Sequence, residues 1–247
     1  MWSFRWFRHF YIFAGPASSI VLCLIFYRYF CNGNLPKVVL LLLDALLGPS
    51  RKPLVSAEDV ILTILVCNIH YWKRAYEVCY VNVFSDQKIH ISHYLIGFVH
   101  YIGVFLCIIG ESEGFVQGSL PKSVSLHKLT VLKISCALIL LWSSYMQFKS
   151  NVILANLRKN KQGTVISYDH KISHDGLFKY ISGPLQLTEI IVYIMLSAIL
   201  WQASTFHYIT LWVLSNQIET AFLTHQWYHK TFKNYPKERK ILIPFIW

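Results

Sequence analysis

Six long apolar runs constrain the fold of this chain more than any other feature. They cover roughly residues 10–30, 57–75, 91–110, 129–148, 186–203 and 207–226, and each is long enough to cross the hydrocarbon core of a bilayer as a helix. The chain is 55% hydrophobic and only 14% charged, whereas about a quarter of the residues in a soluble domain are charged. The sequence therefore predicts an all-α, polytopic transmembrane helix bundle.

A seventh apolar run, at residues 38–47, is too short to span and contains Asp44. It is predicted to be an interfacial or re-entrant piece. The sequence has no internal repeat and no low-complexity tract, so residues 1–247 are expected to form a single membrane-embedded domain.

Basic residues predict the orientation of the bundle. The net charge is +11, and Lys and Arg are concentrated between the fourth and fifth runs and in the C-terminal tail. Six crossings place both segments on one side, which the positive-inside rule makes cytoplasmic. The C-terminus is therefore expected in the cytoplasm. The charge fits a lipid surface better than a nucleic acid, so no nucleic-acid partner is expected.

The segment from Asn151 to Ile191 is polar and basic, and it runs into the fifth apolar run, where Glu189 stands three residues inside. A carboxylate at that depth is costly and usually has a partner or a ligand. Tyr193, four residues on, shares its helical face. A ligand-facing role for Glu189 is the favoured interpretation, and a structural hydrogen bond to a neighbouring helix is the alternative.

A polar stripe precedes this segment. If the fourth helix continues beyond the membrane, Gln147, Asn151 and Arg158 fall within about 40° of one another at 100° per residue. Amide groups followed by a guanidinium suit contacts to amides and phosphates. A solvated face at the end of a span would give the same pattern.

Two further patterns carry weaker signals. At the end of the second run, Tyr71 lies beside His70 and Arg74; a phenol in a dry site can donate to a carbonyl oxygen, but an interfacial anchor is equally typical. His225 and His229 have a spacing that could bind a metal. With no further histidine box, no metal is expected, and neither a Rossmann nor a P-loop motif is present.

Three stretches of this chain resemble the steroid 5α-reductase family. They are HYWKRAYEVCYVNVFSD at residues 70–86, WSSYMQFKSNVILANLRKNKQGTVISYDHKISHDGLFKYISGP at 142–184, and HQWYHKTFKNYPKERKILIPFIW at 225–247. Within the family they look most like the branch that reduces polyprenols or polyprenals. The resemblance covers roughly residues 69–247.

The resemblance implies a multi-pass, NADPH-dependent oxidoreductase of the endoplasmic reticulum membrane. Members have seven helices and transfer a hydride to the β-carbon of an α,β-unsaturated carbonyl. The implied reaction reduces the α-isoprene double bond of polyprenol or polyprenal, which supplies dolichol for protein N-glycosylation. The implied partners are the polyprenyl lipid and membrane lipids, with no obligate protein partner. Residues 149–185 would be a cytoplasmic cofactor-binding segment, and 227–247 a cytoplasmic tail.

The resemblance also implies roles for individual residues. Glu189 matches the glutamate that binds the nicotinamide amide and counts as catalytic with Tyr71, which falls where steroid-reducing members have a tyrosine facing the substrate ketone. The cofactor-binding set, in addition to Glu189, is Arg74, Gln147, Asn151, Arg158, His170, His225 and Tyr228.

The chain departs from the family at several positions. Leu185 replaces a polar residue before the glutamate, His170 replaces a tyrosine of the steroid branch, and Thr220 and Thr224 replace an arginine and a histidine of that branch. Only six of the seven spans are strong. The acidic substrate-binding element of steroid members has no clear match, and Glu58 and Asp59 are candidates by position only.

Three alternatives remain at this point. Steroid-enone reduction would require a substrate that the replacements at 220 and 224 disfavour. An isoprenylcysteine-type methyltransferase would be expected to carry paired glutamates, which the tail lacks. A non-catalytic lipid-binding descendant of the reductases would fit Leu185 and the missing span.

Overall fold

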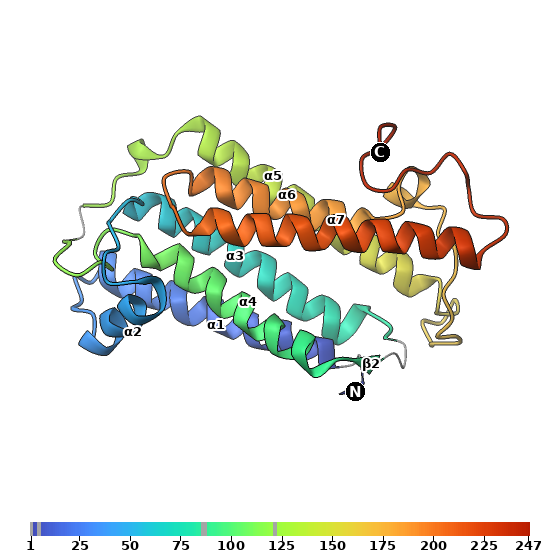
Figure 1. Cartoon of the computed structure of the whole chain (residues 1–247), viewed down its shortest axis with the longest axis horizontal. Helices are drawn as coiled ribbons and strands as arrows, with labels where there is room; N and C mark the ends of the chain where they lie inside the picture. The colour runs from blue at the N-terminus through green and yellow to red at the C-terminus, as the bar shows by residue number, and fades with distance from the viewer. Residues whose placement is uncertain (1, 4–5, 85–87, 121–122) are drawn as a thin grey trace.

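The computed structural model describes residues 2–3, 6–84, 88–120 and 123–247, and six long helices dominate it (Figure 1). Each corresponds to one of the six predicted runs, within a few residues at most ends. The helices are α1 (Phe7–Tyr29), α3 (Ala57–Tyr76), α4 (Ile91–Gly110), α5 (Val131–Asn156), α6 (Pro184–Ile199) and α7 (Phe206–Thr231).

Shorter elements connect these helices. A π-helical turn (Glu77–Val81) continues α3, and 3₁₀ turns lie at Leu126–Lys128 and Gly176–Lys179. Two strands of two residues each, β1 (Trp2–Ser3) and β2 (Lys88–Ile89), pair antiparallel. Apart from this small ladder, the architecture is the all-helical one that the sequence predicts.

The long helices alternate in direction along the chain. In Figure 1 the N-terminus, the segment between α5 and α6, and the C-terminal tail lie at the same end of the bundle. Within the described residues, three helices are both long and apolar enough to cross a bilayer: α1, α4 and α5. Helix α6 is apolar but has 16 residues. The protein is therefore an all-helical membrane protein with three clear candidate spans.

Local chemistry sets the helix boundaries. The Ser56 hydroxyl caps α3 by accepting a hydrogen bond from the Asp59 backbone N–H (3.3 Å), and Thr130 caps α5 in the same way. Helix α6 begins with Pro184. Proline is favourable in the first turn of a helix, because the backbone N–H that it lacks would have no partner there. These caps fix where the polar segments begin and end.

Small and polar side chains let the helices pack closely. Gly15 on α1 faces the Trp72 ring on α3, and Asn68 on α3 donates to the hydroxyls of Ser18 and Ser19 at 2.9 Å. Such small residues and interhelical hydrogen bonds are typical of helix pairs in membranes. Between α5 and α6, the Ser143 hydroxyl donates to the Thr188 carbonyl (3.0 Å), which holds α5 and α6 in register.

The short run predicted to be interfacial or re-entrant forms a helix, α2 (Lys37–Leu47). Its acidic residue, Asp44, pairs with the buried guanidinium of Arg51 at 2.5 Å. Several of its leucines are exposed. The helix lies at the end of the bundle opposite the two chain termini (Figure 1).

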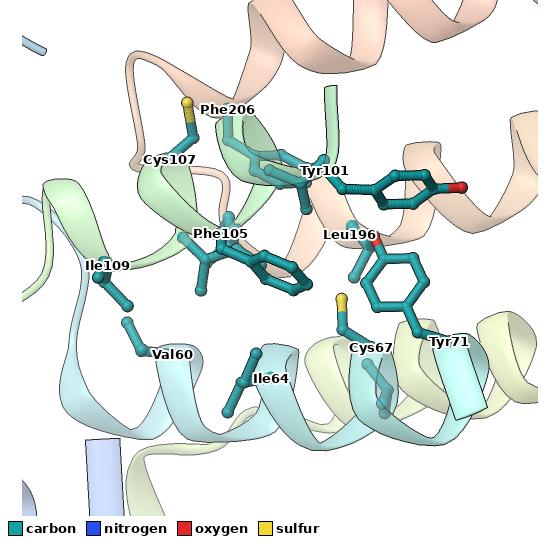
Figure 2. Packing of buried hydrophobic residues seen from close by; sticks show 14 of the residues in the cluster. Val60, Ile64, Cys67, Tyr71, Tyr101, Phe105, Cys107, Ile109, Leu196 and Phe206 are labelled. Carbon is teal, nitrogen blue, oxygen red and sulfur yellow. The ribbon is translucent and has the colours of Figure 1, made fainter. Parts of the chain in front are cut away.

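Helices α3, α4 and α6 share one apolar core. Figure 2 shows the Tyr71 ring of α3 among Cys67 of the same helix, Tyr101 and Phe105 of α4, and Leu196 of α6. The Tyr71 ring meets Tyr101 and Phe105 edge-on, with centroids 5.5 and 5.7 Å away. Tyr71 is only 2% exposed, so its phenol is a polar group inside the core.

Candidate functional site

A direct hydrogen bond joins the glutamate of α6 to the glutamine of α5. The Gln147 side-chain N–H donates to Glu189 Oε2 at 2.5 Å. Gln147 is buried, whereas Glu189 is only partly buried. The carboxylate that the sequence singled out thus has a partner on a neighbouring helix and is still partly exposed. Both interpretations of Glu189, as structural and as ligand-facing, remain compatible with this geometry.

Asn151 lies one helical turn after Gln147 on α5. It is 6% exposed, and its side-chain nitrogen has no hydrogen-bond partner among the described residues. Leaving a buried amide N–H unpaired costs about 1–3 kcal/mol. An unpaired donor one turn from Gln147 is a position where a ligand acceptor would be stabilised.

A cavity of about 570 Å³ opens further along the chain, where its lining begins at Leu154 of α5, and its volume is within the range of small-molecule sites. Gln147, Asn151, Glu189 and His225 are not among its lining residues. Three predicted cofactor residues line it: Arg158, His170 and Tyr228. They come from the turn after α5, the segment that follows it and α7. Three polar groups distant in sequence therefore converge on one cavity. The remaining lining residues are Leu154, Leu157, Lys171, Leu223, Thr224 and Trp227.

The position of Arg158 corrects one expectation. The sequence placed it on a continued helix, but α5 ends at Asn156. The chain then turns back, since the Arg158 carbonyl accepts a hydrogen bond from the Ile166 N–H (2.9 Å). Arg158 therefore reaches the cavity from a loop rather than from the polar stripe of α5.

Contacts hold the Arg158 guanidinium against the cavity wall. It donates to the Val83 carbonyl (2.6 Å), to the Asp169 carbonyl (3.3 Å) and toward His170 Nδ1 (3.4 Å). Burial lowers the pKa of His170, and the nearby positive charge of Arg158 lowers it further. His170 is therefore neutral at pH 7, as an acceptor for a guanidinium must be. The charge available to an anion in this cavity comes from Arg158 and Lys171.

Arg74 and Tyr71 lie deeper in the bundle. Arg74 is 8% exposed, pairs with Glu77 at 2.5 Å and donates to the Tyr11 hydroxyl at 2.6 Å. Neither Arg74 nor Tyr71 lines this cavity. Glu189 nevertheless lies close enough to interact electrostatically with both. The two residues therefore belong to the polar interior next to Glu189.

The Tyr71 hydroxyl belongs to a buried polar cluster. It lies within hydrogen-bonding reach of Tyr193, the residue that shares a helical face with Glu189. The Tyr193 hydroxyl in turn bonds His100 Nε2 on α4 at 2.7 Å. A substrate carbonyl could reach Tyr71 only after the surrounding helices separate, because the phenol is covered on all sides.

His225 connects the functional segment to the tail. Its Nδ1 bonds the Ser182 hydroxyl at 2.6 Å, and the same hydroxyl bonds the Tyr235 hydroxyl at 2.7 Å. His229 lies beside it, with ring centroids 4.5 Å apart. In the part of the chain that the structure describes, no three His, Cys, Asp or Glu side chains gather as metal ligands. His225 thus holds the chain just before α6 in place.

The tail itself packs along the same segment. The backbone of Ile181 and Lys240 forms a parallel bridge, and Arg239 donates to the Ser173 carbonyl at 2.9 Å. The residues of the predicted cytoplasmic segment and the predicted tail therefore form one structural unit around the cavity.

The structure adds residues that the sequence did not assign to the site. Lys73 donates to the Gln147 side-chain oxygen at 2.6 Å and pairs with Glu77 at 3.2 Å. In the sequence, Lys73 reads as one more basic residue at a membrane edge. Glu77, which is fully buried, could have been noticed because it stands four residues after Lys73, at ion-pair spacing.

The candidates for an acidic substrate element are engaged elsewhere. Glu58 pairs with Lys128 at 3.0 Å, and Asp59 pairs with Lys133 at 2.6 Å. Both acids are in the first turn of α3, at the opposite end of that helix from Tyr71 and Arg74. The structure therefore gives them ion-pairing roles away from the cavity.

Comparison with known proteins is consistent with this geometry. Residues 104–247 match the profile of a family described as 3-oxo-5-alpha-steroid 4-dehydrogenase. The chain is 35% identical over 245 residues to the polyprenal reductase of Drosophila melanogaster, covering 98% of this chain and 75% of that protein. It is 33% identical to the polyprenal reductase of Caenorhabditis elegans and 32% identical to that of Homo sapiens, covering 98% of this chain in both cases and 78% and 77% of those proteins.

Proposed function

The chain belongs to the 3-oxo-5-alpha-steroid 4-dehydrogenase family, the steroid 5α-reductases, and from this premise we propose that it reduces polyprenal with NADPH. It is an oxidoreductase acting on a CH–CH group, and its curated relatives are polyprenal reductases from insect to human. The reaction saturates the α-isoprene double bond and yields dolichal, the precursor of dolichol.

The residues of the cavity, together with polar side chains of α5, α6 and α7 outside its lining, fit a nicotinamide dinucleotide. Arg158 would bind a phosphate, since a guanidinium offers several donors in a planar fork. Asn151 has a buried N–H without a partner among the described residues, which suits a carboxamide oxygen. Glu189 would accept the carboxamide N–H through Oε1, and Tyr228 and His170 would line the ribose and phosphate path. His225 would support this wall through Ser182.

When bound, NADPH supplies a hydride for the β-carbon of the unsaturated aldehyde. The protein's part is to orient the reactants and exclude water. Tyr71 would donate a hydrogen bond to the aldehyde oxygen and stabilise the negative charge that develops there. Because Tyr71 is buried, the polyprenyl chain must enter between helices, which suits a hydrocarbon arriving from the bilayer. Arg74 would act as a fixed positive charge near this oxygen.

The cellular setting follows from the same proposal. The chain would cross the endoplasmic reticulum membrane six times, with residues 149–185, the tail 227–247 and thus the C-terminus in the cytoplasm, where NADPH is found. The basic tail lies at the same end of the bundle as the segment between α5 and α6 (Figure 1), which supports this orientation. Polyprenal and membrane lipids would be its partners, and its product would supply dolichol for protein N-glycosylation.

The observation that carries the proposal is the convergence of Arg158, His170 and Tyr228 on one cavity, at the end of the bundle toward which α5 runs on from the Gln147–Glu189 pair. The test is NADPH oxidation by purified protein with polyprenal and with a steroid enone, followed by product identification. Faster turnover of polyprenal, with dolichal as the product, is expected. Faster turnover of the steroid would reassign the substrate, and no turnover of either would favour a non-catalytic lipid-binding protein.

A further inference from the structure

The Gln147–Glu189 pair is connected to a further set of polar contacts at the end of α3. The Lys73 ammonium group, at the end of α3, has three oxygen neighbours: the Gln147 side-chain oxygen at 2.6 Å, the Ser144 carbonyl at 3.1 Å and a Glu77 oxygen at 3.2 Å. An ammonium group has three donors and no acceptor. The contacts to Gln147 and Ser144 are hydrogen bonds, and the contact to Glu77 is an ion pair.

The orientation of the Gln147 amide follows from its two neighbours. Lysine only donates, and an ionised carboxylate only accepts. The oxygen of the amide must therefore face Lys73, and its nitrogen must face Glu189, as the distances of 2.6 and 2.5 Å show. Without Lys73 the carboxylate alone would orient the amide, and no donor from α3 would hold the Gln147 side-chain oxygen in place.

The position of Lys73 is itself fixed by its ion pair with Glu77. Glu77 is 0% exposed and also pairs with Arg74 at 2.5 Å, and Arg74 donates to Tyr11 at 2.6 Å. Glu77 thus pairs with both basic side chains at the end of α3, Lys73 and Arg74, and buried charges are typically paired in this way. Glu77 begins a π-helical turn, an irregularity that often marks functional sites.

We propose that Lys73 is a positioning residue for cofactor binding: through Gln147 it fixes the Glu189 carboxylate so that one oxygen is occupied and the other is presented to the ligand's carboxamide. In the part of the chain that the structure describes, the hydrogen bond to Glu189 engages Oε2 and leaves Oε1 available. The inference rests on the proposed use of NADPH and extends it to a residue outside the cavity.

The test compares Lys73→Met with Lys73→Arg in full-length protein, with Lys37→Met as the matched control, because Lys37 is an exposed lysine at the other end of the bundle. The dissociation constant of NADPH is measured by fluorescence, and KM and kcat by turnover. Lys73→Met is expected to raise the Kd and the KM for NADPH about tenfold. Its KM for polyprenal is expected to stay within about twofold, and Lys73→Arg should recover most of the binding.

A double variant separates positioning from a general effect on structure. If Lys73 acts through Gln147, Lys73→Met should add little to Gln147→Leu, whereas independent structural effects would add. Gln147→Glu provides a second approach should Lys73→Met fold poorly: it keeps an acceptor for Lys73 but replaces the donor to Glu189 by a like charge. It should weaken NADPH binding at least as much as Lys73→Met.

Unchanged NADPH affinity in Lys73→Met, or additive effects in the double variant, would overturn the inference. The proposed function fails separately. If the unmodified protein binds NADPH without reducing polyprenal, the substrate is wrong, while the affinity series still decides the role of Lys73. If it reduces polyprenal and Lys73→Met binds NADPH normally, only the inference fails.

Discussion

The two ends of the helix bundle treat charge in opposite ways. At one end, here called the closed end (α2, residues 48–59, 111–120, 123–133 and 200–205), four acidic side chains are each held by a partner. Asp44 pairs with Arg51, Glu58 with Lys128, and Asp59 with Lys133. Glu111 accepts hydrogen bonds from the backbone and hydroxyl groups of Ser204 and Thr205.

At the other end, here called the cavity end (residues 70–84, 147–189 and 224–247), polar side chains bond to one another but keep unused donors or acceptors. Glu189 is bonded through one oxygen, and Asn151 has an unpartnered N–H within the described chain. Arg158 lines an open cavity. Paired charges at the closed end therefore serve the fold, whereas the incomplete pairing at the cavity end suits a ligand.

The largest expected effect is on Glu189. Glu189→Gln should lower kcat/KM with polyprenal about 100-fold, the upper range for a hydrogen bond to a charged group. The thermal unfolding midpoint should change little, because Gln147 keeps an acceptor. Steady-state kinetics on purified protein measures this, with Glu219→Gln, an exposed acid on α7, as the control. Full activity in Glu189→Gln would contradict a role for this carboxylate in the reaction.

The closed end should respond in stability instead. Glu111→Ala leaves the N–H groups of Ser204 and Thr205 without their acceptor and should lower the free energy of unfolding by about 2 kcal/mol. The KM for NADPH of the folded fraction should not change. Thermal unfolding in detergent together with kinetics tests both statements, and a raised KM at unchanged stability would contradict the division between the two ends.

Substitution of Arg158 should affect cofactor binding rather than stability, and by less than substitution of Glu189. Arg158→Ala should raise the KM for NADPH about tenfold because a charge-assisted hydrogen bond to a phosphate is lost. Arg158→Lys should recover part of the loss, since the charge stays while the planar fork is gone. A similar rise in the KM for polyprenal would argue that Arg158 supports the fold rather than the cofactor.

The smallest effect is a dependence on pH at the closed end. Burial alone would raise the pKa of Glu111, but the hydrogen bonds from Ser204 and Thr205 outweigh burial and lower it. A lowered folded-state pKa means that the stabilisation is present above the unfolded value of 4.5 and is lost as the pH falls through the folded value. The difference in unfolding midpoint between the unmodified protein and Glu111→Gln should therefore stay constant near neutral pH and shrink as the pH falls below 4.5. A constant difference would mean that ionisation of Glu111 contributes nothing.

The helices were predictable from the sequence because apolar runs of nearly 20 residues have few other folds available. The convergence of Arg158, His170 and Tyr228 was predictable only through the family resemblance. The contact between Gln147 and Glu189 was not, because hydropathy does not tell which helices are neighbours. Arg158 was placed on a helix that ends two residues earlier.

The role of Lys73 was not predictable from the sequence for a different reason. A lysine at the end of an apolar run is the normal marker of a membrane edge. Its role depends on a glutamine 74 positions away, which no local pattern records. The same limit applies to Tyr11, which receives a hydrogen bond in the core from Arg74, 63 positions away.

Hydrogen exchange with and without NADPH tests the contrast between the two ends most directly. Binding at the cavity end should slow exchange in peptides covering residues 151–183 and 224–240 and leave those covering 48–56 and 200–205 unchanged. NADPH-induced protection confined to the closed end, or no protection at residues 151–183, would contradict the assignment of the cofactor site.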